Sequence, residues 1–265
     1  MRLLLIGDFH GKIPKLKKEH ENFDAVLCTG DLPYGKELTK LFFKHAKEIH
    51  EGKELYDLIS REKYLTLYSK ALKSQEPILN WLNKWKKPVF FVYGNHDYDF
   101  NALKGVKYIK FLSLNKLVEK YENIKLLTNR IAQFKDINIL GFSDSFSRHH
   151  KTDEFKKMWN DRLSKLFKKI KKEGVNIFLT HDPPKGALDL VKNKKSFAYG
   201  KHYGDNIFPK YIKKYKPQIM VCGHMHENQG RKMLGKTLVI NAGCSHDNHY
   251  SFLIIENKKI RVKLI

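Results

Sequence analysis

The chain has 265 residues, a formal net charge of +23, and 42% hydrophobic and 12% aromatic residues, which is enough apolar material for one large core. It has no apolar run near the length of a membrane span, its apolar start is too short for a signal peptide, and its three cysteines have no paired spacing. We therefore expect a soluble, cytoplasmic, single-domain protein over residues 1–265, without a membrane partner or a disulfide framework.

The positive charge has two explanations. An excess of 51 Lys and Arg over 28 Asp and Glu would suit a polyanionic partner such as nucleic acid. The lysines are instead spread through nearly every segment with acids between them, as in residues 165–173, which is typical of solvated helix faces. Lys and Glu enrichment with few cysteines also fits a source that is hot or low in GC. The charge leaves a nucleic-acid partner open, and no motif indicates one.

The chain begins with two strands that each end in a polar turn. Residues 3–6 are apolar and lead into a turn with Asp8 and His10, and residues 23–28 lead into a turn with Gly30 and Asp31. The intervening residues 12–21 form a loop or a short helix. This order predicts a βαβ unit with both turns on the same side.

The character of the chain changes between residues 34 and 87. Apolar residues such as Leu38, Leu41 and Phe42 recur at helical spacing and predict two or three amphipathic helices. We interpret this segment as a helical insertion at about 34–87. It leaves from the Asp31 turn and returns into the next strand, so we expect it to roof or flank the site.

An apolar run at residues 89–92 is followed by Gly94, Asn95, His96 and Asp97. Four apolar residues in a row predict a fully buried strand, and open α/β sheets place their sites at the carboxyl ends of such strands. Alone, this tetrapeptide is more typical of a polar turn whose Gly and Asn supply positive φ.

The second half of the chain predicts further strands and helices. Residues 130–134 and 137–142 alternate around Lys135-Asp136 and predict a hairpin, and Thr152 and Gly174 bound a basic helix over residues 153–173. The other predicted elements are strands at 106–114, 123–127, 175–179, 218–222, 237–240, 251–255 and 260–265, and a short helix from 205 towards 214.

Two of these later strands also end in histidine-containing turns, Thr180-His181-Asp182 and Gly223-His224-Met225-His226. Five apolar strands thus end in carboxylate, amide and imidazole groups, and a sheet would bring the five ends to one edge. These donors suit divalent Mn, Fe, Zn, Ni or Co. The alternative, that all are turn residues and satisfied histidines, would require the same coincidence at five strand ends.

A pair of metal ions would need a bridging carboxylate. Two cations about 3.5–4 Å apart repel each other, and a water between them becomes a hydroxide nucleophile near neutral pH. Asp31 is the natural bridge. Two histidines spaced as His224 and His226 project from one turn and can reach two neighbouring ions.

These five motifs, in this order, resemble those of the calcineurin-like metallophosphoesterase family, over nearly the whole chain outside residues 34–87. The resemblance implies an α/β fold in which two mixed β-sheets pack as a sandwich flanked by helices, a four-layer αββα arrangement. It also implies a dinuclear metal-dependent phosphoesterase. By this resemblance Asp8, His10 and His226 bind the first metal, Asp31 bridges, Asn95, His181 and His224 hold the second, and His96 is the catalytic histidine that contacts the phosphate and protonates the leaving oxygen.

The run from Thr180 to Asp189 further resembles a phosphodiesterase-type branch with a Thr-His-x-Pro-Pro motif. A phosphodiesterase that acts by in-line attack of a metal-bridging hydroxide is therefore the expected function. A nuclease or a phosphomonoesterase on the same metal core remains an alternative, as does a scaffold without catalysis. Asp182 departs from the pattern, because a small residue is expected there.

Overall fold

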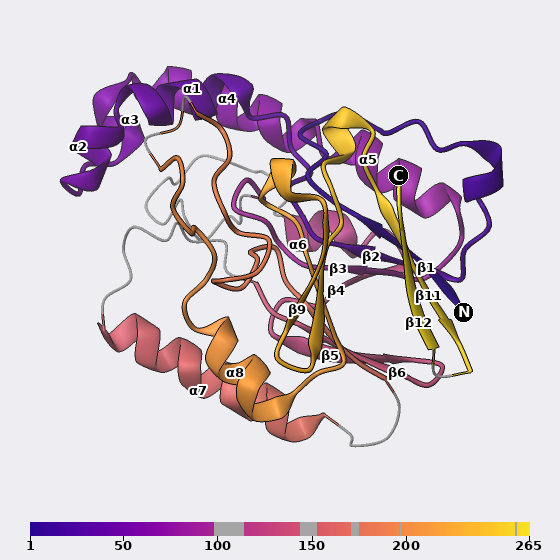
Figure 1. Cartoon of the computed structure of the whole chain (residues 1–265). Helices are drawn as coiled ribbons and strands as arrows, with labels where there is room; N and C mark the ends of the chain where they lie inside the picture. Colours follow the sequence, from indigo (N-terminus) through magenta and orange to yellow (C-terminus); the bar gives the residue numbers. More distant parts are fainter. Residues whose placement is uncertain (98–113, 144–152, 171–174, 195, 197, 258) are drawn as a thin grey trace.

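The computed structural model describes residues 1–97, 114–143, 153–170, 175–194, 196, 198–257 and 259–265, and the thin grey trace in Figure 1 marks the rest. The described strands form two six-stranded sheets. The first has the order β12-β11-β1-β2-β3-β4, and the second has the order β5-β6-β7-β8-β10-β9. The predicted α/β class with two mixed sheets is confirmed.

The first sheet has a parallel centre and an antiparallel edge. β1 pairs in parallel with β2, β2 with β3, and β3 with β4, whereas β11 and β12 close the sheet antiparallel to their neighbours. The strands are β1 (Arg2–Ile6), β2 (Ala25–Cys28), β3 (Val89–Phe91), β4 (Ile124–Leu126), β11 (Ser251–Glu256) and β12 (Lys259–Leu264).

The second sheet repeats this design. β6, β7, β8 and β10 run parallel, and β5 and β9 pair antiparallel at the two edges. Its strands are β5 (Arg130–Phe134), β6 (Ile137–Gly141), β7 (Val175–Leu179), β8 (Ile219–Cys222), β9 (Gly230–Leu234) and β10 (Thr237–Asn241).

Alternation along the strands produces four layers. Leu3 and Leu5 of β1 face the second sheet and join a core with Ile177 and Leu179 of β7, whereas Leu4 points away from it. The outer face of the first sheet packs on α5 (Glu76–Lys84) and α6 (Leu114–Val118). The outer face of the second packs on α7 (Asp153–Lys169) and α8 (Phe208–Tyr215), which lie side by side at the bottom of Figure 1.

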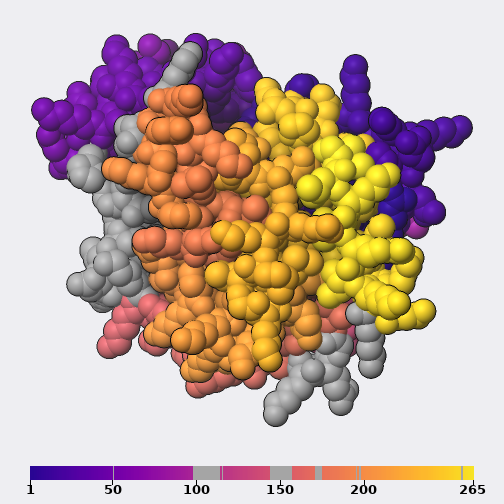
Figure 2. Space-filling model, viewed as in Figure 1, coloured from indigo at the N-terminus to yellow at the C-terminus, as the bar shows by residue number. Residues whose placement is uncertain are grey.

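The helical segment between β2 and β3 has a small core of its own. Its helices are α1 (Lys36–Lys44), α2 (Ala46–His50), α3 (Leu55–Leu58), α4 (Arg61–Lys73) and α5, rather than the two or three expected. The Ser60 side chain accepts a hydrogen bond from the Lys63 N–H and so begins α4 as a separate helix. Leu38, Leu55 and Tyr68 are buried together, and the part of the segment that carries α1 to α4 projects at the upper left of the molecule in Figure 2.

Other differences from the sequence expectation are local. The strand β9 is not predicted, because its Arg231 and Lys232 are exposed and hide the strand pattern. The strand predicted at 106–114 lies outside the described residues except for Leu114, which begins α6, and Thr152 and Gly174 lie outside them too. No helix in the described part of the chain is long and apolar enough to cross a membrane.

Candidate metal centre

The candidate site lies where the ends of β1, β2 and β3 meet the ends of β7 and β8. The expectation that one sheet edge would hold all five turns is therefore wrong, because the strands are divided between the two sheets. Hydrogen bonds join the sheets here. The Asp8 carboxylate accepts the His224 N–H at 3.1 Å, and His181 Nδ1 lies 2.7 Å from the Thr29 carbonyl oxygen.

The backbone of these turns is unusual for residues with side chains. Asp8, His10, Asp31 and His224 have φ values of 52°, 44°, 56° and 67°. This left-handed region disfavours residues other than glycine, and such strain persists where the surrounding structure over-determines it, commonly at functional sites. Four strained residues in one site indicate that the turns are shaped to aim their side chains.

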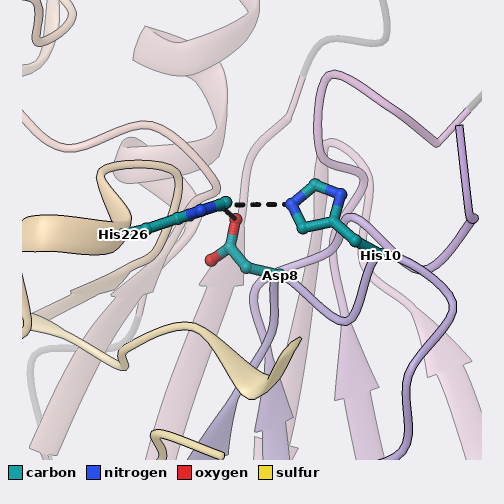
Figure 3. A group of neighbouring side chains, drawn as sticks. All are labelled: Asp8, His10 and His226. Carbon is teal, nitrogen blue, oxygen red and sulfur yellow. Dashed lines mark hydrogen bonds and ion pairs between the residues drawn. The ribbon is translucent and has the colours of Figure 1, made fainter. Parts of the chain in front are cut away.

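Asp8, His10 and His226 form the first donor group (Figure 3). The Nε2 atoms of His10 and His226 are 3.1 Å apart, and Asp8 Oδ1 lies 3.3 Å from His226 Nε2. Figure 3 shows the two rings pointing toward each other across the Asp8 carboxylate, although His226 follows β8 and the other two follow β1. Two imidazole nitrogens and one carboxylate oxygen thus converge on one point.

Asn95, His181 and His224 form the second donor group. Asn95 Oδ1 is 2.9 Å from His181 Nε2 and 2.8 Å from His224 Nδ1, and these two nitrogens are 3.1 Å apart. Because the Thr29 carbonyl accepts a hydrogen bond from His181 Nδ1, Nε2 is the ring nitrogen that faces the group.

Asp31 lies between the two groups. Its Oδ2 is 3.4 Å from His181 Nε2 in the second group and 3.8 Å from His10 Nε2 in the first. The side chain is 2% exposed. A single carboxylate oxygen therefore faces both groups, as a bridging ligand would.

The electrostatics of the site keep its carboxylates ionised. Burial raises the pKa of Asp31, but His181, His96 and His10 outweigh burial and hold that pKa below its ordinary value. Burial also raises the pKa of Asp8, but the hydrogen bond with His226 and the nearby His181 outweigh burial and lower this pKa below its ordinary value.

The first group's histidines differ in protonation. Burial lowers the pKa of His10 to about 4, so its ring is neutral at pH 7. Burial also lowers the pKa of His226, but the hydrogen bond to Asp8 outweighs it and raises this pKa to about 11. A cation at this point would replace the His226 proton.

His96 lies at the rim of the first group. Its backbone N–H donates to Asp31 Oδ1 at 2.7 Å, and its ring centroid is 5.2 Å from that of His10. The donor atoms of His10, Asp31 and His96 lie within 4.8 Å of one another. The structure thus places His96 beside the first donor group.

Two buried residues position the turns. Asp97 Oδ2 accepts hydrogen bonds from the N–H groups of Asp31 and Gly94, at 2.6 and 2.7 Å. Asn241 Nδ2 donates to the carbonyl oxygens of Gly223 and Met225 and so holds the turn that carries His224 and His226. From the sequence, Asp97 is expected to be a turn residue or a residue that supports the ligands, rather than a catalytic one, and the pattern does not show which turns it joins.

The donor set fits a pair of divalent transition metals. Carboxylate, amide oxygen and imidazole are suited to borderline cations, and imidazole nitrogens 3.1 Å apart in both groups are at the separation expected of neighbouring ligands on one ion. Fold and donor set together define an α/β sandwich with a candidate metal site between its two sheets.

Comparison with solved structures supports this fold. One crystal structure superposes with a TM-score of 0.71 at 18% identity, covering 100% of this chain and 98% of that one. The crystal structure of the protein TT1561 of Thermus thermophilus superposes with a TM-score of 0.57 at 13% identity, covering 99% and 98%.

Comparison of sequences shows the family. The model of the calcineurin-like phosphoesterases matches residues 1–228, so the chain belongs to that family. Members of this family are metallophosphoesterases, which hydrolyse phosphoester bonds with two divalent metal ions.

Two relatives show how far the likeness extends. Human metallophosphoesterase domain-containing protein 1 is 29% identical over 185 residues, 63% of this chain, and the match spans 55% of the human protein. Uncharacterized protein MJ1162 of Methanocaldococcus jannaschii is 24% identical over 272 residues, which cover 100% of this chain and 95% of that protein.

Proposed function

We propose that this protein is a dinuclear metal-dependent phosphodiesterase. The observation that carries the proposal is the position of Asp31, whose single Oδ2 faces donor atoms of both groups. In this proposal Asp31 bridges the two ions. The first ion is held by Asp8, His10 and His226, and the second by Asn95, His181 and His224.

The bound ions would supply Lewis acidity and a water of lowered pKa. The protein's own residues balance the charge, orient the ligands and move the proton. Asp8 and Asp31 remain ionised and offset the positive charge, and the Thr29 carbonyl holds the His181 ring in its ligating tautomer. His96, anchored through its backbone N–H to Asp31, contacts the phosphate and gives a proton to the leaving ester oxygen.

Diester specificity is the finer part of the proposal. It is supported by the Thr180-to-Asp189 run and its Thr-His-x-Pro-Pro motif. We also propose that residues 1–265 act as one domain, with the helical segment inserted at about 34–87. A cytoplasmic location and Mn²⁺ as a native metal are further proposals. The charge of +23 keeps nucleic acid among the substrates to be tested.

The proposal is tested by metal analysis together with hydrolysis of an aryl phosphodiester. We expect two ions per chain and turnover that chelation abolishes and divalent metal restores. Asp31→Asn should remove most of this turnover, while Asp161→Asn on the exposed surface of α7 should not. A protein that binds no transition metal, or whose turnover survives Asp31→Asn, would contradict the proposal.

The same assay separates the alternatives. Aryl phosphomonoesters turned over faster than diesters would indicate a monoesterase. Cleavage of DNA or RNA that persists in excess small phosphodiester and falls steeply with salt would indicate a nuclease.

A further inference from the structure

Asp182 is a carboxylate beside the second donor group that the function above does not use. It directly follows His181 in the turn after β7, where the family resemblance leads to a small residue. The Thr180 hydroxyl donates to the Asp182 carbonyl oxygen at 2.8 Å, so the turn is held through its backbone and the carboxylate is not needed for that hydrogen bond.

The direction of approach distinguishes a ligand from a supporting residue. Asp182 Oδ1 lies 3.7 Å from His224 Nδ1. This nitrogen is the one that faces Asn95 Oδ1 and His181 Nε2. A carboxylate that merely orients a metal-bound histidine contacts its other ring nitrogen. Asp182 therefore lies on the metal side of the His224 ring.

The spacing also allows one ion to reach the carboxylate. Donor atoms of His181, Asp182 and His224 lie within 4.8 Å of one another. Two ligand atoms about 2.0–2.2 Å from one ion lie at most about 4.4 Å apart, and the 3.7 Å between Asp182 Oδ1 and His224 Nδ1 is within that limit. The Asp182 side chain is 25% exposed, so it lies at the edge of the site rather than in the core.

We infer that Asp182 is an additional ligand of the ion held by Asn95, His181 and His224. The inference rests on the proposed function, because it requires that second ion. An added anionic oxygen makes the ligand set of the second site less polarisable than a set of two imidazoles and one amide. Carboxylates suit Mn²⁺, whereas imidazoles suit Zn²⁺. Asp182 would thus favour Mn²⁺ over Zn²⁺ at this site and leave the Asp8, His10 and His226 site unchanged.

The test is calorimetric titration of chelator-treated protein with Mn²⁺ and with Zn²⁺, alongside the electron paramagnetic resonance of the Mn²⁺-loaded protein. Asp182→Ala removes the carboxylate, and Asp182→Asn keeps a weaker oxygen donor. Glu227→Gln is the matched control, because this exposed carboxylate lies next to His226 in sequence, accepts from the Lys192 N–H, and changes the net charge equally. Circular dichroism checks that each variant is folded.

We expect the wild type to bind two Mn²⁺ with an exchange-coupled signal. Asp182→Ala should weaken one of the two Mn²⁺ sites by about tenfold or more, with a smaller loss for Zn²⁺ and an intermediate loss in Asp182→Asn. Glu227→Gln should leave both sites unchanged. Equal losses in Asp182→Ala and Glu227→Gln would show long-range charge rather than ligation and overturn the inference.

Two other results overturn it in distinguishable ways. If the wild type binds two Mn²⁺ and Asp182→Ala does so with unchanged affinity, the inference fails and the dinuclear proposal stands. If the wild type binds fewer than two ions, the dinuclear proposal fails and the role of Asp182 with it.

Discussion

Asp97 Oδ2 accepts the backbone N–H of Asp31 at 2.6 Å, which ties the turn after β3 to the turn after β2. The same oxygen accepts from Gly94, and Oδ1 accepts from Leu32 at 2.8 Å. Burial and the nearby Asp31 raise the pKa of Asp97 to about 7, whereas the backbone N–H groups that it accepts from favour its ionised form. Asp97 thus positions Asp31 without belonging to either donor group.

Replacing Asp97 tests this positioning role. In Asp97→Ala the buried N–H groups of Asp31, Gly94 and Leu32 lose their acceptor, so we expect the free energy of unfolding to fall by on the order of 3 kcal/mol or more. Urea unfolding measures this loss, and metal titration should show weaker binding. Asp161→Asn, on the exposed surface, should change neither quantity. An unchanged unfolding midpoint in Asp97→Ala would contradict the role.

Gly30 and Gly52 form a matched pair for the packing of the site. Both are left-handed, with φ of +98° and +94°, but an added Cβ at Gly30 would lie 2.3 Å from the Gly94 nitrogen, whereas one at Gly52 would meet nothing within 4 Å. Gly52→Ala should therefore lower the free energy of unfolding by only about 1 kcal/mol, the cost of placing a Cβ on a left-handed backbone. Gly30→Ala should cost about 2–4 kcal/mol and weaken metal binding, because the turn after β3 must move.

Thermal unfolding and metal titration of the two variants decide this. Equal losses of stability, with metal binding intact in both, would show that the close approach of the two turns is unimportant.

Much of this site can be predicted from sequence because apolar strands and polar turns are local features. Asp8, Asp31, Asn95 and His181 each follow a short apolar run, and parallel pairing brings such ends together. Local pattern cannot show which sheet a strand joins. The contact of His181 with Thr29, and the division of the site between two sheets, depend on packing between residues far apart in the chain.

The sequence is least informative where a residue acts through distant partners. Asp97 and a turn-forming Asp look alike in sequence, since hydrogen bonds to Asp31 and Leu32 span more than 60 residues. Likewise β9 depends on its antiparallel partner β10 rather than on its own apolar content.

His96 is expected to act in catalysis rather than in metal binding. His96→Asn keeps the backbone N–H that donates to Asp31 but removes the ring near His10. Turnover of an aryl phosphodiester should fall about 10²–10⁴-fold with two ions still bound. His249→Asn, at an exposed position, is the control. Loss of one ion in His96→Asn would instead make His96 a ligand, and unchanged turnover would remove it from the mechanism.

Asp24 and Lys135 join the two sheets far from the metal centre and predict a pH dependence of stability. Asp24 Oδ1 lies 2.8 Å from Lys135 Nζ in the turn between β5 and β6, and Oδ2 accepts the Arg2 N–H at 2.7 Å. The Lys135 hydrogen bond, followed by that of Arg2, lowers the pKa of Asp24 in the folded protein. Unfolding returns it to about 3.9.

Because the folded pKa is the lower one, the stabilisation is fully present above about pH 4 and is lost as the pH falls through the folded value. Asp24→Asn should therefore destabilise the protein at neutral pH by about 0.2–1 kcal/mol, since the side chains are 34% and 52% exposed. Urea unfolding across pH should show this difference shrinking under acid conditions. Glu37→Gln, whose partner Lys70 is 3.6 Å away with both side chains more than half exposed, should show a smaller difference at every pH. A constant difference for Asp24→Asn down to strongly acid pH would mean that the ion pair does not contribute, because an unpaired carboxyl would titrate alike in both states.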